Sequence, residues 1–126
     1  MKNEPVAKRL LIVDDDQGVR ESVELLMTTL GFEVTTAESG RTAIDFFQDN
    51  QQLFDWAIID VFMPGMDGIE TAGRIRNTHP NLPIILATGD TNTPIPDQLM
   101  QQPHTALIRK PYRSAAILQR LDSISS

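Results

Sequence analysis

The feature of this sequence that most constrains its fold is a regular alternation of short apolar runs with segments of helical periodicity. The runs are rich in apolar or β-branched residues and span 8–13, 32–37, 55–60, 83–88 and 105–110. Runs of this length that are bounded by turn residues favour buried strands. Because neighbouring parallel strands need crossover connections, and helical segments stand between these runs, we predict an α/β fold with a five-stranded parallel sheet covered on both faces.

The helical segments show apolar residues on one face. In the first, Val19, Val23 and Met27 share that face, and Gly31 follows as the expected C′ residue. Ser39 is a plausible N-cap for the second helix. The third and fifth helices are predicted at 67–77 and 113–124, whereas prolines at 94, 96 and 103 confine any fourth helix to about 97–102.

Polar residues stand at the ends of four predicted strands. Asp14 and Asp15 follow the first strand, Asp60 ends the third, Thr88 ends the fourth and Lys110 ends the fifth. In open parallel sheets ligands bind beyond the carboxyl ends of the strands, where the strand order reverses. For the expected order 2-1-3-4-5 that point lies between the first and third strands, so these side chains should share one crevice.

The chemistry of this crevice indicates a hard cation and a phosphoryl group. Two carboxylates a few ångströms apart repel by roughly 4 kcal/mol at an effective dielectric constant near 20, and a divalent cation removes that repulsion. The chain has no cysteine, and oxygen ligands favour Mg²⁺. Lys110 and Thr88 could neutralise a phosphoryl group that arrives at the Asp60 carboxylate, which suits the formation of an acyl phosphate.

Composition narrows the possible partners and location. The formal net charge of −6 over 126 residues disfavours direct contact with nucleic acid. No apolar run approaches the ~20 residues needed to cross a bilayer, and no apolar segment follows the early basic residues. We therefore expect one soluble cytoplasmic domain over 1–126, with its core at about 8–122, that does not contact a membrane.

Four segments together resemble a known family. "LLIVDDD", "AIIDVFMPGMDG", "PIILATG" and "LIRKPY", in this order and at these separations, are similar to the receiver domain of two-component response regulators, the CheY-like family. The likeness covers about residues 8–122. It implies a flavodoxin-like (βα)5 three-layer sandwich and a signalling switch that assists its own Mg²⁺-dependent phosphorylation and dephosphorylation without being a metabolic enzyme.

The resemblance implies a role for each reacting residue. Asp60 would be the phosphoacceptor, which receives phosphate from a histidine kinase or a histidine phosphotransfer protein. Thr88 and Lys110 would hold the phosphoryl oxygens. The bond between Lys110 and Pro111 would be cis, an isomer that X-Pro adopts at a cost of only ~0.5–1 kcal/mol.

The resemblance also implies a set of ligands for Mg²⁺. Asp15 would bind the ion directly, Asp14 directly or through water, and Asp60 and the backbone carbonyl of Phe62 would complete the protein ligands. Asp16, the third acid of the run, is expected to cap the first helix, where a negative charge suits the helix dipole.

Two departures from the family pattern concern signal output. Leu107 stands where the family usually has an aromatic residue that rotates inward upon phosphorylation, and the fourth helix is interrupted by proline. Output through the usual switch, and dimerisation through the face of the fourth helix, are therefore open. We expect a monomer or weak dimer that regulates an unidentified effector protein.

Two other classes remain as alternatives. A pseudo-receiver would have the same fold and bind a protein without phosphorylation, but the complete set of Asp14, Asp15, Asp60, Thr88 and Lys110 argues against it. An aspartate-nucleophile phosphatase is suggested by the aspartates at 14–16 as a D-x-D match. That class expects a Gly-Thr continuation, whereas Gln17 and Gly18 follow here.

Overall fold

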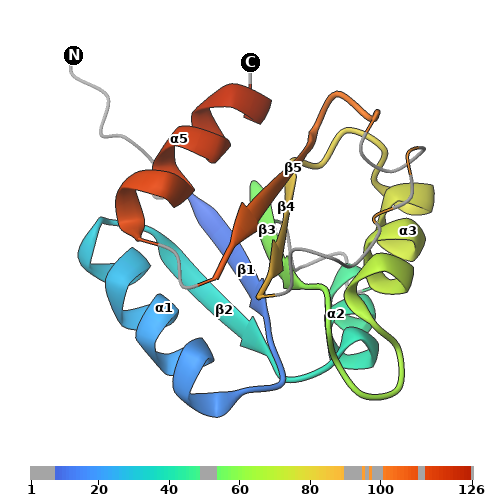
Figure 1. Cartoon of the computed structure of the whole chain (residues 1–126), viewed down its shortest axis with the longest axis horizontal. Helices are drawn as coiled ribbons and strands as arrows, with labels where there is room; N and C mark the ends of the chain where they lie inside the picture. The colour runs from blue at the N-terminus through green and yellow to red at the C-terminus, as the bar shows by residue number, and fades with distance from the viewer. Residues whose placement is uncertain are drawn as a thin grey trace.

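The computed structural model describes residues 8–48, 54–89, 95, 97, 101–110 and 113–125. Strands and helices alternate from β1 to β4, and β5 and α5 follow as the next described elements (Figure 1). The elements are β1 (Arg9–Val13), α1 (Gln17–Thr29), β2 (Glu33–Ala37), α2 (Gly40–Gln48), β3 (Trp56–Asp60), α3 (Gly68–Thr78), β4 (Ile84–Thr88), β5 (Thr105–Arg109) and α5 (Ser114–Ser125). Residues 98–100 of the predicted fourth helix, and Pro111 with its peptide bond, lie outside the described residues.

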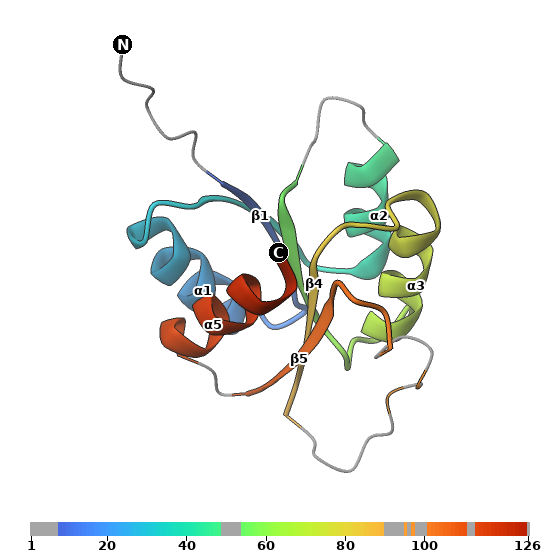
Figure 2. The same ribbon diagram turned by 90° about the horizontal axis from the view of Figure 1, so that it is seen from above.

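The five strands form one parallel sheet in the order β2-β1-β3-β4-β5, as predicted. Figure 2 shows α1 and α5 on one side of this sheet and α2 and α3 on the other. The α/β sandwich expected from the sequence is therefore confirmed. Among the described residues, no helix is long and apolar enough to cross a membrane.

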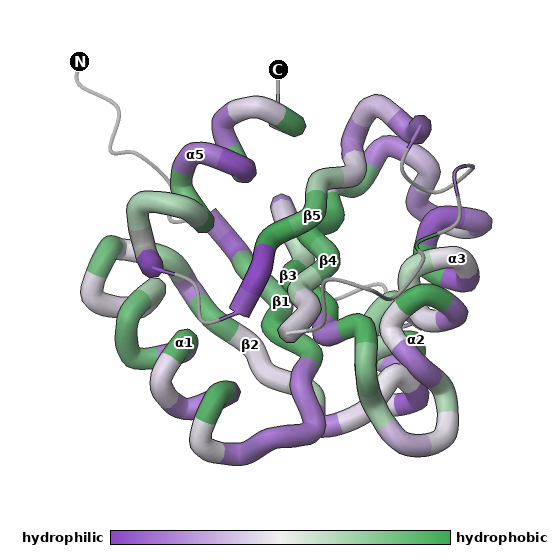
Figure 3. The backbone as a smooth tube through the Cα atoms, in the orientation of Figure 1, coloured by the Kyte–Doolittle hydropathy of each residue, from purple (hydrophilic) through white to green (hydrophobic). Residues whose placement is uncertain are grey.

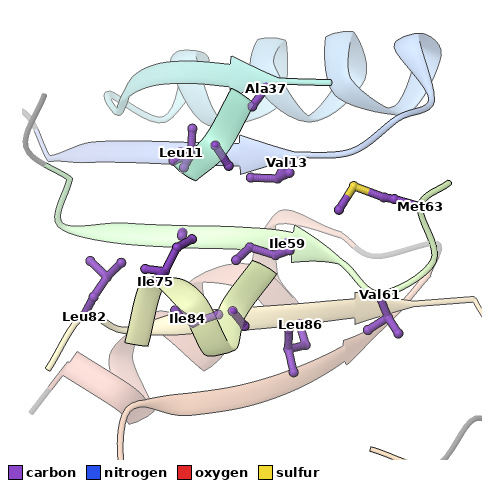
Figure 4. Close-up of a cluster of buried hydrophobic side chains, with 13 residues drawn as sticks. Leu11, Val13, Ala37, Ile59, Val61, Met63, Ile75, Leu82, Ile84 and Leu86 are labelled. Atoms are coloured by element: carbon purple, nitrogen blue, oxygen red, sulfur yellow. The ribbon is translucent and has the colours of Figure 1, made fainter. Parts of the chain in front are cut away.

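Side chains that alternate along each strand supply two separate cores. Leu11, Ile59 and Leu86 belong to the core on the side of α2 and α3, which Ile75 of α3 completes (Figure 4). Leu10, Ile58 and Ile85 belong to the core on the side of α1 and α5. Because both faces are covered, the central strands are mostly apolar (Figure 3), and β4 is buried throughout.

Short polar contacts set where the helices begin and end. The Asp16 carboxylate accepts a hydrogen bond of 3.1 Å from the Val19 amide, which confirms its predicted capping role. Ser39 accepts one of 3.1 Å from the Thr42 amide. Gly31 follows α1 with a φ of 97°, a left-handed conformation that favours glycine and ends the helix as predicted.

Candidate functional site

The polar residues predicted at the strand ends lie at the carboxyl edge of the sheet. Asp14 follows β1, Asp60 ends β3, Thr88 ends β4 and Lys110 follows β5. Sheet hydrogen bonding extends to this edge, because the Asp14 amide donates to the Ala37 carbonyl at 3.1 Å and the Lys110 amide donates to the Thr88 carbonyl at 2.8 Å. The rigid sheet thus sets the spacing of these residues.

Three carboxylates converge at this edge. Asp14, Asp15 and Asp60 each offer an oxygen atom, and these atoms lie within 4.8 Å of one another. Asp14 and Asp60 are only 2% and 6% exposed, whereas Asp15 is exposed. Their repulsion in a partly desolvated crevice needs a compensating positive charge.

Lys110 supplies part of that charge. Its Nζ lies 2.7 Å from Asp14 Oδ2 and 3.2 Å from Asp60 Oδ1, so one ammonium group bridges both buried carboxylates. Burial opposes the charged form of the amine. The hydrogen bond to Asp14 and the charges of Asp60 and Asp14 outweigh burial and raise the pKa of Lys110.

The charged form of the Asp60 carboxylate is disfavoured despite its contact with Lys110. Burial, followed by the charge of Asp14, raises the pKa of Asp60 to about 6, although Lys110 and a hydrogen bond from the Phe62 backbone act in the opposite direction. A carboxylate with a raised pKa gains most from an added cation. The residue predicted to be the phosphoacceptor is thus a buried carboxylate whose charged form would be stabilised by a bound cation.

The remaining contacts of the acidic residues differ strongly. The Asp14 carboxylate accepts a hydrogen bond of 2.9 Å from the Asp16 amide through its other oxygen. For the Asp15 carboxylate, no hydrogen bond or ion pair is formed with the described part of the chain. Asp14 is thus held by its neighbours, while the nearby Asp15 is exposed.

The donor set fits a magnesium ion. Three carboxylates with oxygen atoms close together, two of them buried, match the hard oxygen ligands that Mg²⁺ prefers. One lysine does not balance three acidic groups, so a divalent cation would complete the charge balance. Phe62 is the second residue after the end of β3, and it is 49% exposed.

The third helix is held against the strand that carries Asp60. The Gly68 amide donates to the Val61 carbonyl at 2.9 Å. A Cβ atom at Gly68 would lie only 2.7 Å from the Asp60 carbonyl carbon and 2.8 Å from Val61 Cα. Only glycine allows the start of α3 to lie this close to the backbone of Asp60 and Val61.

Sequence reasoning missed two arginines. Nη1 of Arg20, in α1, donates to the main-chain oxygen of Asp14 at 2.8 Å. No local pattern signals this contact. Arg76 of α3 is 7% exposed and lies at the amino end of β4 and β5. Its position in register with the apolar residues of α3 is the signal that could have predicted its burial.

Arg76 holds several main-chain groups. Its guanidinium donates to the Leu82 and Pro80 carbonyls before β4, to the His104 carbonyl at 3.2 Å and to Thr105 Oγ1 at 2.7 Å. Its Nε has no partner among the described residues. This network lies at the edge of the sheet opposite the carboxylates and has a structural role.

Comparison with known proteins agrees with the site. Residues 10–122 match the family described as the response regulator receiver domain. The response regulator MprA of Mycolicibacterium vanbaalenii is 39% identical over 80 residues, which cover 64% of this chain and 34% of that protein. The chain spans about a quarter to a third of the length of the curated relatives it matches.

Two solved structures show the same fold. The chemotaxis protein CheY4 of Vibrio cholerae has a TM-score of 0.81 and 30% identity, with 94% of this chain and 99% of that chain covered. The response regulator TrrA of Thermotoga maritima, solved in complex with Mg²⁺ and BeF, has a TM-score of 0.78 and 30% identity, with 93% and 98% covered. With its sheet order, its crevice of carboxylates and this match over nearly its whole length, the chain belongs to the receiver domains of response regulators, which are signalling switches.

Proposed function

We propose that this receiver domain accepts a phosphoryl group on Asp60 and thereby regulates a partner protein. The observation that carries the proposal is the contact of one ammonium group, Lys110 Nζ, with both Asp14 and Asp60 in a crevice of three carboxylates. This arrangement holds a nucleophilic carboxylate beside a positive charge and beside further acidic ligands. A histidine kinase or a histidine phosphotransfer protein is the proposed donor.

In the proposed reaction, one oxygen of Asp60 attacks phosphorus and forms an acyl phosphate. The bond from phosphorus to the donor breaks, and its electron pair stays with the leaving group, which is the histidine nitrogen of a protein donor or the acetate oxygen of acetyl phosphate. Lys110 stabilises the charge on the phosphoryl oxygens, because its ammonium group already lies 3.2 Å from Asp60. The Thr88 hydroxyl at the end of β4 is the second proposed donor to these oxygens.

The proposed magnesium ligands are Asp15, Asp14, Asp60 and the backbone carbonyl of Phe62. A bound ion would offset the repulsion that raises the pKa of Asp60 and would neutralise charge on the phosphoryl oxygens. Asp14, held by Asp16 and Lys110, keeps its carboxylate in place whether it contacts the ion directly or through water.

Labelling with a small donor tests the proposal. Incubation with Mg²⁺ and acetyl phosphate should add one phosphoryl group, detected by intact mass, and Asp60→Asn should abolish the label. Asp45→Asn is the matched control, because Asp45 is an exposed carboxylate on α2. Labelling of Asp60→Asn at the rate of the unchanged protein would place the acceptor elsewhere.

The proposed switch draws Thr88 and Lys110 toward the phosphoryl group and changes the segment that follows β4. Leu107 on β5 is not aromatic and is 36% exposed, so the proposed change does not involve the burial of an aromatic ring at this position. Beryllofluoride with Mg²⁺ mimics the phosphoryl group and should shift amide resonances between 89 and 107. Resonances that stay unchanged there would reject this route of output.

A pseudo-receiver predicts a different pattern of results. It would bind its partner with equal affinity before and after treatment with acetyl phosphate, and Asp60→Asn would leave that binding unchanged. The proposed receiver instead requires that phosphorylation alter the affinity for its effector. We propose that it acts as a monomer or weak dimer.

A further inference from the structure

Arg20 makes an unusual contact with the acidic end of β1. It lies in the first turn of α1, where its amide donates to the Asp16 carbonyl at 2.9 Å. Its half-buried side chain turns back, and Nη1 donates to the main-chain oxygen of Asp14 at 2.8 Å. The guanidinium thus holds a neutral carbonyl beside three carboxylates, and within the described ranges it forms no ion pair with any of them.

The carbonyl held by Arg20 belongs to the peptide group that joins Asp14 to Asp15. The Asp14 amide is held by Ala37, and its carboxylate is held by the Asp16 amide and by Lys110. The orientation of the next peptide group decides where the Asp15 side chain points. Arg20 provides the side-chain contact that fixes this peptide group.

The Asp15 carboxylate depends on its backbone for placement. It is exposed, and it has no hydrogen bond or ion pair to the part of the chain that the structure describes. A side chain without its own partners follows the orientation of the main chain that carries it. Asp15 nevertheless brings an oxygen atom within 4.8 Å of those of Asp14 and Asp60.

The charge of Arg20 and a positioning role of its side chain have opposite effects on metal binding. A guanidinium close to a cation site repels the cation, so Arg20 weakens metal binding unless its geometric effect is larger. Its charge also reaches Glu38, the residue after β2, where it contributes, after hydrogen bonds from the backbone and Thr42, to a lowered pKa of Glu38. The repulsion of a divalent cation by the Arg20 charge weakens metal binding, whereas the placement of the Asp15 carboxylate by Arg20 strengthens it. Because these two effects have opposite signs, an experiment can separate them.

We propose that Arg20 is a positioning residue that orients the peptide group between Asp14 and Asp15, and thereby holds the Asp15 carboxylate in place to bind Mg²⁺. This inference rests on the magnesium site of the proposed function. It predicts that the loss of Arg20 weakens Mg²⁺ binding although a repelling charge is removed.

The test is a titration of the full chain with Mg²⁺, followed by the amide resonances of residues 14–18. Arg20→Gln should weaken binding by about tenfold, the lower end of the effect known for groups that orient metal ligands. Arg20→Lys keeps the charge and a donor group, and its affinity for Mg²⁺ should lie between that of the unchanged protein and that of Arg20→Gln. Arg74→Gln is the charge-matched control, because Arg74 pairs with Glu70 on the exposed surface of α3 and should leave the affinity unchanged.

The outcomes separate the two proposals. Unchanged or tighter Mg²⁺ binding in Arg20→Gln would overturn the positioning role. Should Arg20→Gln fail to fold by circular dichroism, Arg20→Lys decides, since wild-type affinity in that variant would also overturn it. A wild-type protein that binds Mg²⁺ but takes no label on Asp60 would defeat the proposed function and leave the result on Arg20 intact.

Labelling kinetics provide a readout that general instability would not reproduce. With acetyl phosphate, Arg20→Gln should need more Mg²⁺ for half-maximal rate and should recover the wild-type rate at saturating Mg²⁺. A lowered rate that saturating Mg²⁺ does not restore would contradict a role limited to the metal ligand.

Discussion

Lys110 Nζ donates a hydrogen bond of 2.7 Å to Oδ2 of Asp14, a residue 96 positions earlier in the chain. The contact joins the ends of β1 and β5, which are not neighbours in the sheet, across the crevice that contains Asp60. It offsets part of the repulsion between two buried carboxylates. The following predictions depend on this balance of charge and on the packing beneath it.

Removal of the Lys110 charge should destabilise the metal-free protein. In Lys110→Gln the Asp14 and Asp60 carboxylates lose their shared partner, and the free energy of unfolding should fall by roughly 1–3 kcal/mol. Urea unfolding in EDTA measures this change. Added Mg²⁺ should stabilise Lys110→Gln more than the unchanged protein, because the ion replaces the missing charge.

Arg113→Gln serves as the control for this effect. Arg113 is exposed just before α5, and its replacement should leave both the stability and the response to Mg²⁺ unchanged. Equal stability of Lys110→Gln and Arg113→Gln in EDTA would show that Lys110 does not relieve the carboxylates.

The raised pKa of Asp60 predicts a dependence of stability on pH. Because the folded pKa of about 6 exceeds the ordinary value of 3.8 for an aspartate, the folded state binds more protons than the unfolded state between these two pH values. The contribution of Asp60 to stability is therefore greatest below about pH 4 and is lost as the pH rises through about 6. In EDTA, we expect this loss to be roughly 1–3 kcal/mol.

Asp60→Asn isolates that contribution. From pH 4 to pH 7, the unfolding free energy of Asp60→Asn should rise relative to that of the unchanged protein. Above about pH 7, this difference should stay constant. A constant difference across this range would mean that Asp60 titrates at an ordinary pKa. Mg²⁺ should reduce the difference at neutral pH, because it favours the carboxylate.

Two glycines of the same helix should respond oppositely to alanine. In Gly68→Ala the new methyl group would collide with the backbone of Asp60 and Val61, so we expect destabilisation by roughly 1–3 kcal/mol. Gly73 has no atom within 4 Å of such a group, so Gly73→Ala should stabilise α3 by about 0.5–1 kcal/mol. Thermal unfolding of both variants checks the contrast, and similar shifts of the same sign would contradict it.

Arg76 should matter for stability and not for phosphorylation. Arg76→Ala removes the donor to the Leu82 carbonyl and the Thr105 hydroxyl, at a cost of roughly 2–4 kcal/mol, whereas the His104 carbonyl keeps its hydrogen bond of 2.8 Å from the Ile84 amide. The exposed Arg74→Ala should change stability by less than about 1 kcal/mol. Folded Arg76→Ala should still accept phosphate from acetyl phosphate at the wild-type rate, and a lost label in folded protein would contradict this separation.

Much of the fold could be predicted because its signals are local. The apolar runs that became β3 and β4 are buried on both faces, and their length and composition indicate this without knowledge of neighbours. Asp16 and Gly31 mark the ends of α1 through contacts and backbone angles that lie within a few residues. The rule that ligands bind at the carboxyl ends of parallel strands then predicted that Asp14, Asp60 and Lys110 would lie together, with Thr88 at the same edge of the sheet.

By itself, therefore, the sequence determined the alternation of elements, the sheet they form and the edge at which the acidic groups gather. The tertiary structure alone decided that Lys110 bridges Asp14 and Asp60, that Asp60 has a raised pKa, and that Arg20 holds the backbone of Asp14. The physical reason is the sequence separation over which each interaction acts, because hydrophobic periodicity and helix capping depend on residues only a few positions apart. Burial and electrostatic coupling, in contrast, exist only after distant segments have packed.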